Sequence, residues 1–305
     1  MNVSSSAAEH GVSPVMPVEV VPSMLYALGE SVPASTPLPW ISPAARGWIP
    51  FQCYALRSAG NLILIDGGLA VHRQQIAAGL SALLEPATSL TMMITRRDVD
   101  SIINIPWLLR TFCFDLIRFA NADFTPLDFF AAFDQANAEA QVYAITSPAK
   151  VEWMPVGTVT AVGELPLEYF RTSMRVLATN WLYEATSRTL FTSDSFGFLT
   201  RGQAGGPLVV QPGQANLTVA DIVDFLNAKF DWMVGSDTSA MIAELTTLIQ
   251  ERPIDRVCPA YGCIIEGKEA VSLLFAQTIE AMRILGDTPR QSVLKDFDWS
   301  IAAQG

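Results

Sequence analysis

The chain has 305 residues, of which 50% are hydrophobic and 16% are charged, and its formal net charge is −11 at pH 7. This composition excludes intrinsic disorder, because it supplies enough apolar surface for a packed core. The acidic charge, without a stripe of Lys and Arg, excludes nucleic acid as an expected partner. No apolar run approaches the roughly 18 residues of a membrane-spanning helix, and no signal-peptide pattern is present, so we expect no membrane insertion and a cytoplasmic location.

Both strands and helices are predicted along the first half of the chain. Residues 1–17 are rich in Ser, Ala, Val and Pro and are expected to form a loose N-terminal arm. Hydrophobic periodicity and turn residues then predict strands at 51–56 and 61–66, a helix at 70–84, a strand at 90–95 and a helix at 105–120. In the last of these, the apolar residues recur on one face and Pro106 suits the first turn.

The second half repeats this order of strands before helices. Strands are predicted at 142–145, 165–170, 174–183, 189–192 and 256–258, and helices at 219–230, 237–250 and 267–285. Residues 195–216 are rich in Gly, Pro and Gln and are expected to form a long loop that covers a site or meets a partner. Because no linker separates the halves, we expect one domain over 18–305.

Four cysteines are present, and none of them forms a CxxC pair. They are Cys53, Cys113, Cys258 and Cys263. This spacing indicates reduced thiols rather than a disulfide framework or a zinc knuckle.

Four segments, taken in order, carry a family resemblance. They are NLILIDGG at 61–68, TRRDVDS at 95–101 with NIPWLL after it, LFTSDSFG at 190–197, and CPAYG at 258–262. Together they resemble the metallo-β-lactamase superfamily, and most of all the oxygen-binding diiron domain (ODP domain) of flavodiiron proteins. The resemblance implies an α/β (α+β) fold, a four-layer αββα sandwich, in which the aspartate of the first segment braces the site.

The same resemblance places other residues where the family has metal-binding histidines. Arg96, Ser101 and Tyr261 stand at three such positions, and a fourth lies near Tyr169. Three carboxylates remain as candidate ligands, namely Asp98, Asp100 and Asp194. Imidazole is the usual ligand of zinc or iron pairs in such folds, so we expect the dinuclear metal site, and any resident cofactor, to be missing.

Clustered carboxylates need a counter-charge, because two like charges about 4 Å apart cost roughly 4 kcal/mol at an effective dielectric of about 20. Our first hypothesis is that the guanidinium of Arg96, with Arg97 in the same loop, replaces the metal among the three aspartates. The arrangement is then either a structural ion pair or a pocket that receives an anionic ligand.

The second hypothesis is a divalent metal such as Mn, Fe, Zn or Mg, held by Asp98, Asp100 and Asp194 with help from Glu168. In that case Tyr169 or Tyr261 would donate a hydrogen bond to a developing oxyanion during hydrolysis. Against this, Arg96 would place a positive charge beside the cation.

The sequence therefore favours a degenerate member of this fold, a pseudoenzyme that binds a small molecule or a partner protein as a sensor or non-catalytic subunit. The alternative is an enzyme, either a metal-dependent hydrolase or a diiron-like oxidoreductase with a carboxylate-rich site. A homodimer is also expected, because diiron relatives commonly assemble in pairs.

Overall fold

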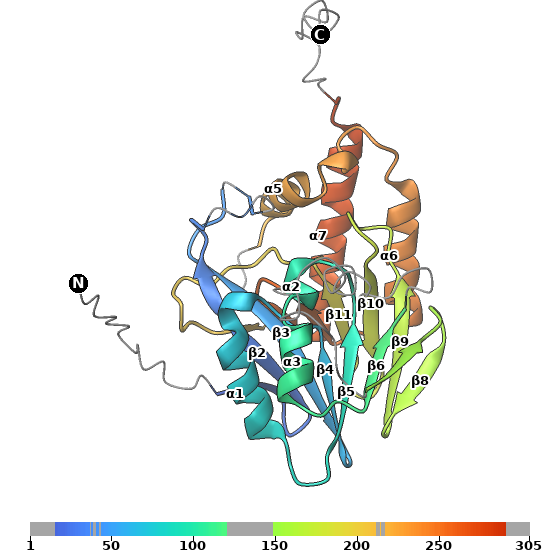
Figure 1. Ribbon diagram of the computed structural model, residues 1–305. Coiled ribbons are helices and arrows are strands. Elements are labelled where there is room, and N and C mark those ends of the chain that lie inside the picture. Colours follow the sequence, from blue (N-terminus) through green and yellow to red (C-terminus); the bar gives the residue numbers. More distant parts are fainter. Residues whose placement is uncertain are drawn as a thin grey trace, which may run out of the picture.

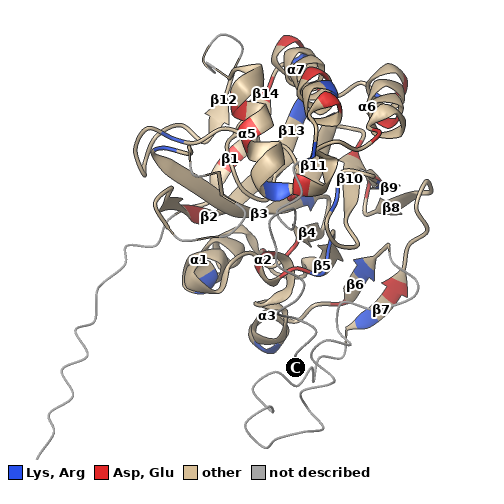
Figure 2. Ribbon diagram, turned by 90° about the horizontal axis from the view of Figure 1, so that it is seen from above, with Lys and Arg blue, Asp and Glu red and all other residues tan. Residues whose placement is uncertain are grey.

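The computed structural model describes residues 16–120, except 37, 39, 40 and 43, and residues 149–290, except 212, 213, 215 and 216. These residues form two seven-stranded sheets that pack face to face, with helices on the outer face of each (Figure 1). Seen from above, α1 and α3 lie on one side of the paired sheets and α5, α6 and α7 on the other (Figure 2). The predicted four-layer αββα sandwich is confirmed.

The first sheet follows the order of the chain. Its strands are β1 (Val18–Val21), β2 (Leu25–Pro33), β3 (Trp48–Ser58), β4 (Asn61–Ile65), β5 (Ser89–Ile94), β6 (Leu116–Phe119) and β7 (Lys150–Trp153). The strands from β4 to β7 are parallel, so their carboxyl ends meet at one edge. The helical segments beside them are η1 (Ala70–His72), α1 (Arg73–Leu83), α2 (Val99–Ile102) and α3 (Ile105–Thr111).

The second sheet has the strand order β12-β14-β13-β11-β10-β9-β8. Its strands are β8 (Val159–Val162), β9 (Leu165–Arg171), β10 (Asn180–Glu184), β11 (Thr189–Ser193), β12 (Val209–Val210), β13 (Arg256–Pro259) and β14 (Ile264–Glu266). The helical segments are α5 (Val219–Lys229), η3 (Asp231–Met233), α6 (Ser239–Glu251) and α7 (Lys268–Asp287). Since β11 and β13 are parallel neighbours, the residues that follow them lie side by side.

Three apolar clusters fill the spaces between the four layers. One lies between the sheets and includes Tyr54, Leu182 and Phe191. The other two lie between each sheet and its helices, as shown by Leu80 on the first side and Phe275 on the second. None of the helices in the described part of the chain is long and apolar enough to cross a membrane.

The helix predicted over 105–120 is wrong in its second half. Helix α3 ends at Thr111, Phe112 is extended, and β6 follows at Leu116–Phe119. The strand pairs in parallel with β5, and Ile117 is 1% exposed. A short apolar run fits a buried strand as well as a helix, and tertiary pairing decided between them.

Other element predictions are mostly confirmed, with shifted limits. The strand predicted at 174–183 begins only at Asn180, because the preceding turn is held by Glu244, which accepts hydrogen bonds from the backbone N–H and the hydroxyl of Ser173. Strands β7, β8 and β14 were not predicted, and β12 interrupts the loop predicted at 195–216. The strand predicted at 142–145 and most of the predicted arm lie outside the described residues.

Candidate functional site

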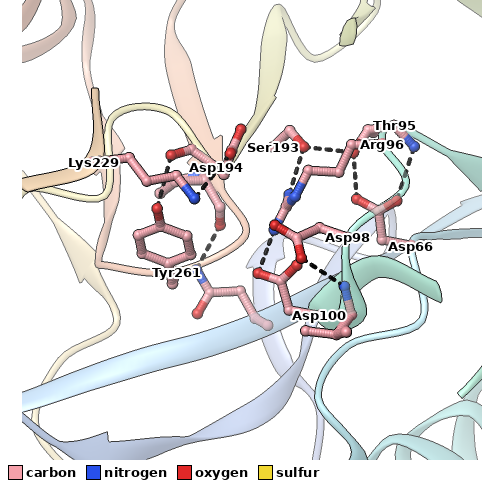
Figure 3. A network of polar contacts seen from close by, with 12 residues as sticks. Asp66, Thr95, Arg96, Asp98, Asp100, Ser193, Asp194, Lys229 and Tyr261 are labelled. Carbon is pink, nitrogen blue, oxygen red and sulfur yellow. Dashed lines mark hydrogen bonds and ion pairs between the residues drawn. The ribbon is translucent and has the colours of Figure 1, made fainter. Parts of the chain in front are cut away.

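The candidate site lies where the carboxyl ends of β4, β5, β11 and β13 meet (Figure 3). Asp66 follows β4, Arg96 follows β5, Asp194 follows β11 and Tyr261 follows β13. Asp66 and Ser193 adopt left-handed backbone conformations, with φ of 62° and 54°. Such conformations are costly for residues other than glycine and cluster at functional sites, and here they turn two strand ends into the polar cluster.

Arg96 is the centre of this cluster and is only 2% exposed. Its Nη1 donates a hydrogen bond to Ser193 Oγ at 2.5 Å, and its Nη2 forms an ion pair with Asp100. Asp100 lies in α2, four residues after Arg96, and the short turn through Asp98 into the helix brings the two head groups together. Burial by itself lowers the pKa of Arg96, but the carboxylates of Asp100, Asp194 and Asp66 raise it above its ordinary value, so the guanidinium stays charged.

A hydrogen-bonded chain fixes the loop that carries Arg96. Asp66 accepts from the backbone N–H of Thr95 at 2.8 Å and from its hydroxyl at 2.6 Å. The Thr95 hydroxyl also lies 2.8 Å from Ser193 Oγ, which joins the two sheets. Burial raises the pKa of Asp66 to about 6, and the nearby guanidinium of Arg96 opposes this shift. The predicted bracing position of this aspartate agrees with these contacts.

A second cation, which the sequence analysis missed, pairs with Asp194, the third buried aspartate of the cluster. Lys229, the last residue of α5, places its Nζ 3.1 Å from Asp194 Oδ2, and the two side chains are 7% and 3% exposed. The hydroxyl of Tyr261 donates to the backbone oxygen of Asp194 at 3.0 Å. A lysine in the last turn of a helix is ordinary, because it complements the helix dipole, so nothing in the sequence distinguished Lys229.

The remaining predicted residues lie around this centre with different contacts. Asp98 caps α2 by accepting from the backbone N–H of Val99 at 2.8 Å, and Arg97 is half-buried beside it. Ser101 is fully buried. The hydroxyl of Tyr169 donates to the backbone oxygens of Ile94, at 3.1 Å, and Arg118, at 3.3 Å, so it binds strand ends rather than the charged groups.

The structure thus brings together Arg96, Asp100, Asp194 and Tyr261 from three separate segments, and adds Lys229 from a fourth. Glu168, considered as a further ligand, instead lies 3.4 Å from the guanidinium of Arg252. Burial raises the pKa of Asp100, opposed by Arg96. Burial, reinforced by the negative charge of Asp194, also raises the pKa of Tyr261 well above its usual range.

These residues do not fit the dinuclear metal site that the fold implies. Within the described ranges, no group of three or more His, Cys, Asp or Glu is arranged to hold a metal ion. The two carboxylates nearest the centre are each paired with a cation of the chain, Asp100 with Arg96 and Asp194 with Lys229. A divalent metal would have to bind beside a guanidinium and an ammonium group, which like-charge repulsion disfavours.

No family model matches this chain, and no curated protein matches its sequence. Solved structures do match its fold. A rubredoxin:oxygen oxidoreductase from the anaerobe Desulfovibrio gigas superposes with a TM-score of 0.67 over 88% of this chain, at 14% identity. The flavodiiron protein of Giardia intestinalis gives 0.58 over 89% of this chain, at 12% identity. A fragment of a diflavin flavoprotein from Nostoc gives 0.64 over 89% of this chain, at 15% identity.

This chain covers different fractions of the three matched proteins. This chain spans 62% of the Desulfovibrio oxidoreductase and 60% of the Giardia protein, but 98% of the Nostoc fragment. The chain therefore has the fold of the metallo-β-lactamase-like domain of flavodiiron proteins, as the sequence motifs predicted. At these identities, the likeness concerns the fold alone.

Proposed function

We propose that this chain is a degenerate metallo-β-lactamase-fold protein that binds a small molecule or a partner protein, as a sensor or non-catalytic subunit, without the dinuclear metal site. The observation that carries this proposal is the buried Arg96, whose guanidinium pairs with Asp100 at a position where the family has a metal ligand. A cation of the chain itself thereby neutralises the carboxylate.

Lys229 supports the same proposal from another part of the chain. Its ammonium group lies 3.1 Å from Oδ2 of Asp194, the carboxylate of the LFTSDSFG segment that the resemblance gives as a candidate metal ligand. A buried charge is tolerated when it is paired and hydrogen-bonded. Two side-chain cations thus take over the charge balance that two metal ions provide in the family, and a resident metal or flavin is not part of the proposed function.

The alternative is an enzyme with a carboxylate-rich site, either a metal-dependent hydrolase or a diiron-like oxidoreductase. One observation favours it: Asp100 Oδ1 and Asp194 Oδ1 are buried and have no hydrogen-bond partner within the described residues. Buried acceptors of this kind are costly unless something donates to them or coordinates them. We rank this alternative second, because both carboxylates already hold a cation through their other oxygen.

Metal content separates the two proposals. The purified full chain is treated with a chelator, incubated with Zn²⁺, Fe²⁺ or Mn²⁺, desalted and measured by plasma mass spectrometry. We expect clearly substoichiometric metal in the wild type and the same value in Asp194→Ala. Near-stoichiometric metal in the wild type that is lost in Asp194→Ala would overturn the proposal and favour the enzyme.

A gain-of-binding variant tests whether the frame of the metal site persists. The variant combines Arg96→His, Ser101→His and Tyr261→His with Lys229→Met, which restores three imidazoles and removes both cations. We expect it to bind Zn²⁺ more tightly than the wild type, provided that circular dichroism shows a folded protein. The single change Lys229→Met serves as the control for removal of charge alone.

A homodimer and a cytoplasmic location also stay proposals. Analytical ultracentrifugation of the full chain at several concentrations tests the homodimer, and a dimer with a concentration-dependent population is the expected result.

The expected absence of a nucleic-acid partner follows from the net charge of −11. A mobility-shift titration with mixed-sequence DNA and RNA tests it.

A further inference from the structure

A second arginine of interest, Arg201, lies in the segment that crosses from β11 back to the first sheet. Its backbone pairs with that of Trp48 through two hydrogen bonds, of 2.8 Å and 2.7 Å. The segment continues through Gly205-Gly206-Pro207 to β12. This segment, residues 199–208, is called the strap below. Its backbone bonds to β3 hold it in place independently of the Arg201 side chain.

A cavity of about 660 Å³ lies between the strap and strands β2 and β3. Its apolar walls include Trp48, Phe51, Pro207 and Leu208. The volume is within the range of sites for small organic ligands, which are mostly apolar with a few polar groups that fix orientation. The cavity is distinct from the charge cluster around Arg96, because none of the four residues gathered there lines it.

The polar group that stands out in this cavity is the guanidinium of Arg201. Its Nη1 donates to Ser31 Oγ at 3.0 Å and to the backbone oxygen of Ala204 at 2.9 Å. Its Nε is buried and has no hydrogen-bond partner in the described part of the chain. No carboxylate among the described residues forms an ion pair with it, although the chain as a whole is strongly acidic.

A guanidinium group that lines a cavity and has no carboxylate partner attracts an anionic ligand. The Nη1 atom is engaged by the protein and the Nε atom is enclosed by it, which leaves Nη2 as the guanidinium nitrogen without a printed bond to the described residues. A charged N–H donor forms a shorter and stronger hydrogen bond with a carboxylate than a neutral donor does.

We propose that the strap cavity binds a small organic monocarboxylate, with the carboxylate held by Arg201 and the apolar body packed against Trp48 and Pro207. Glu30 also lines the cavity, and none of the ion pairs among the described residues joins it to Arg201. Its negative charge disfavours a second negative charge on the ligand, so the site selects monoanions over dicarboxylates. The proposal goes beyond the proposed function and stands whether or not the charge cluster holds a metal.

The test is isothermal titration calorimetry of the full chain with phenylacetate, benzoate, indole-3-acetate and acetate. We expect saturable binding that is stronger for the aromatic acids than for acetate, because the walls are apolar. The variant Arg201→Gln should weaken binding roughly tenfold or more, since it removes a hydrogen bond to a charged group. The matched control is Arg283→Gln, an exposed arginine on α7 that forms its own ion pair with Glu280, and it should leave binding unchanged.

The variant Glu30→Gln should strengthen ligand binding, whereas Arg201→Gln should weaken it. It removes the opposing negative charge, so phenylacetate should bind a few-fold more tightly and phenylsuccinate should gain more than phenylacetate. A general disturbance of the fold would weaken both ligands. Arg201→Lys keeps the positive charge but not the planar guanidinium group, and we expect an intermediate affinity for phenylacetate.

Two results would overturn the proposal. One is the absence of saturable binding for all four acids at millimolar concentration, with the wild type folded as judged by circular dichroism. The other is binding that Arg201→Gln and Arg201→Lys leave unchanged. Metal content, measured as above, does not alter either result, so failure here and failure of the proposed function are distinguishable.

Discussion

Two arginines in this molecule lie in opposite electrostatic situations. Arg96 is 2% exposed and its head group is bound by Asp100 and Ser193. Arg201 lines a cavity and forms no ion pair with a carboxylate of the described residues. The first charge is neutralised by the chain itself and therefore serves the fold. The second is matched only by a group from outside the chain, and we infer that it serves binding.

Removing Arg96 should have the largest effect on stability. The change Arg96→Met leaves Asp100 buried without its counter-charge, and breaking a buried pair from one side costs about 3 to 5 kcal/mol. Denaturant unfolding followed by circular dichroism measures the free energy of unfolding.

The double variant Arg96→Met with Asp100→Leu is the matched control. Replacing a whole buried pair by apolar residues is often close to neutral, so most of the loss should be recovered. A single variant that costs less than about 1 kcal/mol would contradict the view that Arg96 holds the cluster together.

Removing Lys229 should have the next largest effect. Lys229→Met leaves Asp194 without its ion pair, and a hydrogen bond to a buried charged group contributes about 2 to 3 kcal/mol. The same unfolding experiment measures it. Lys268→Met, in the first turn of α7, is the control lysine, and equal losses in the two variants would argue against a special role for Lys229.

The third largest effect is a pH dependence of the free energy of unfolding that arises from Asp66. The folded protein raises the pKa of Asp66 from 3.8 to about 6, so the folded state takes up a proton before the unfolded state as pH falls. This contribution to stability is fully present below pH 3.8 and is lost as pH rises through about 6. Relative to Asp66→Asn, the wild type should lose about 1 to 2 kcal/mol between pH 5 and pH 7.5.

The wild type is compared with Asp66→Asn because His72 also makes the stability depend on pH. Burial lowers the pKa of His72 from 6.5 to about 4, so its contribution to stability falls as pH falls through that range, opposite to Asp66. The His72 contribution is common to the wild type and Asp66→Asn and cancels between them. A difference in unfolding free energy that does not change from pH 5 to pH 7.5 would contradict the raised pKa.

Removing Arg201 should have the smallest effect on stability, in contrast to its effect on binding. Arg201→Gln removes a cation that has no carboxylate partner in the described residues, and each of the two hydrogen bonds from Nη1 is worth about 1 kcal/mol after solvent compensation. Unfolding of the ligand-free protein measures this. A loss as large as that of Arg96→Met would show that Arg201 is a structural residue and would remove the contrast between the two sites.

The sequence predicted half of the charge cluster and missed the other half for a physical reason. Arg96 and Asp100 are four residues apart in one loop that enters α2, so their pairing follows from local geometry. The pairing of Asp194 with Lys229 joins the end of β11 to the end of α5, and no local pattern reports such a contact. Tyr169 shows the reverse case, since the resemblance placed a histidine position near it but its hydroxyl binds the backbone at the ends of β5 and β6.

The sequence by itself determined the fold class and which residues stand in the four motif segments, because ordered motifs and residue identity are properties of the chain alone. Only the tertiary structure decided that 116–119 is a strand rather than a helix, that Lys229 neutralises Asp194, and that Arg201 faces a cavity without a carboxylate partner in the described ranges. These are properties of pairs of distant segments. Burial and charge balance depend on which segments meet, and that is fixed only when the two sheets pack together.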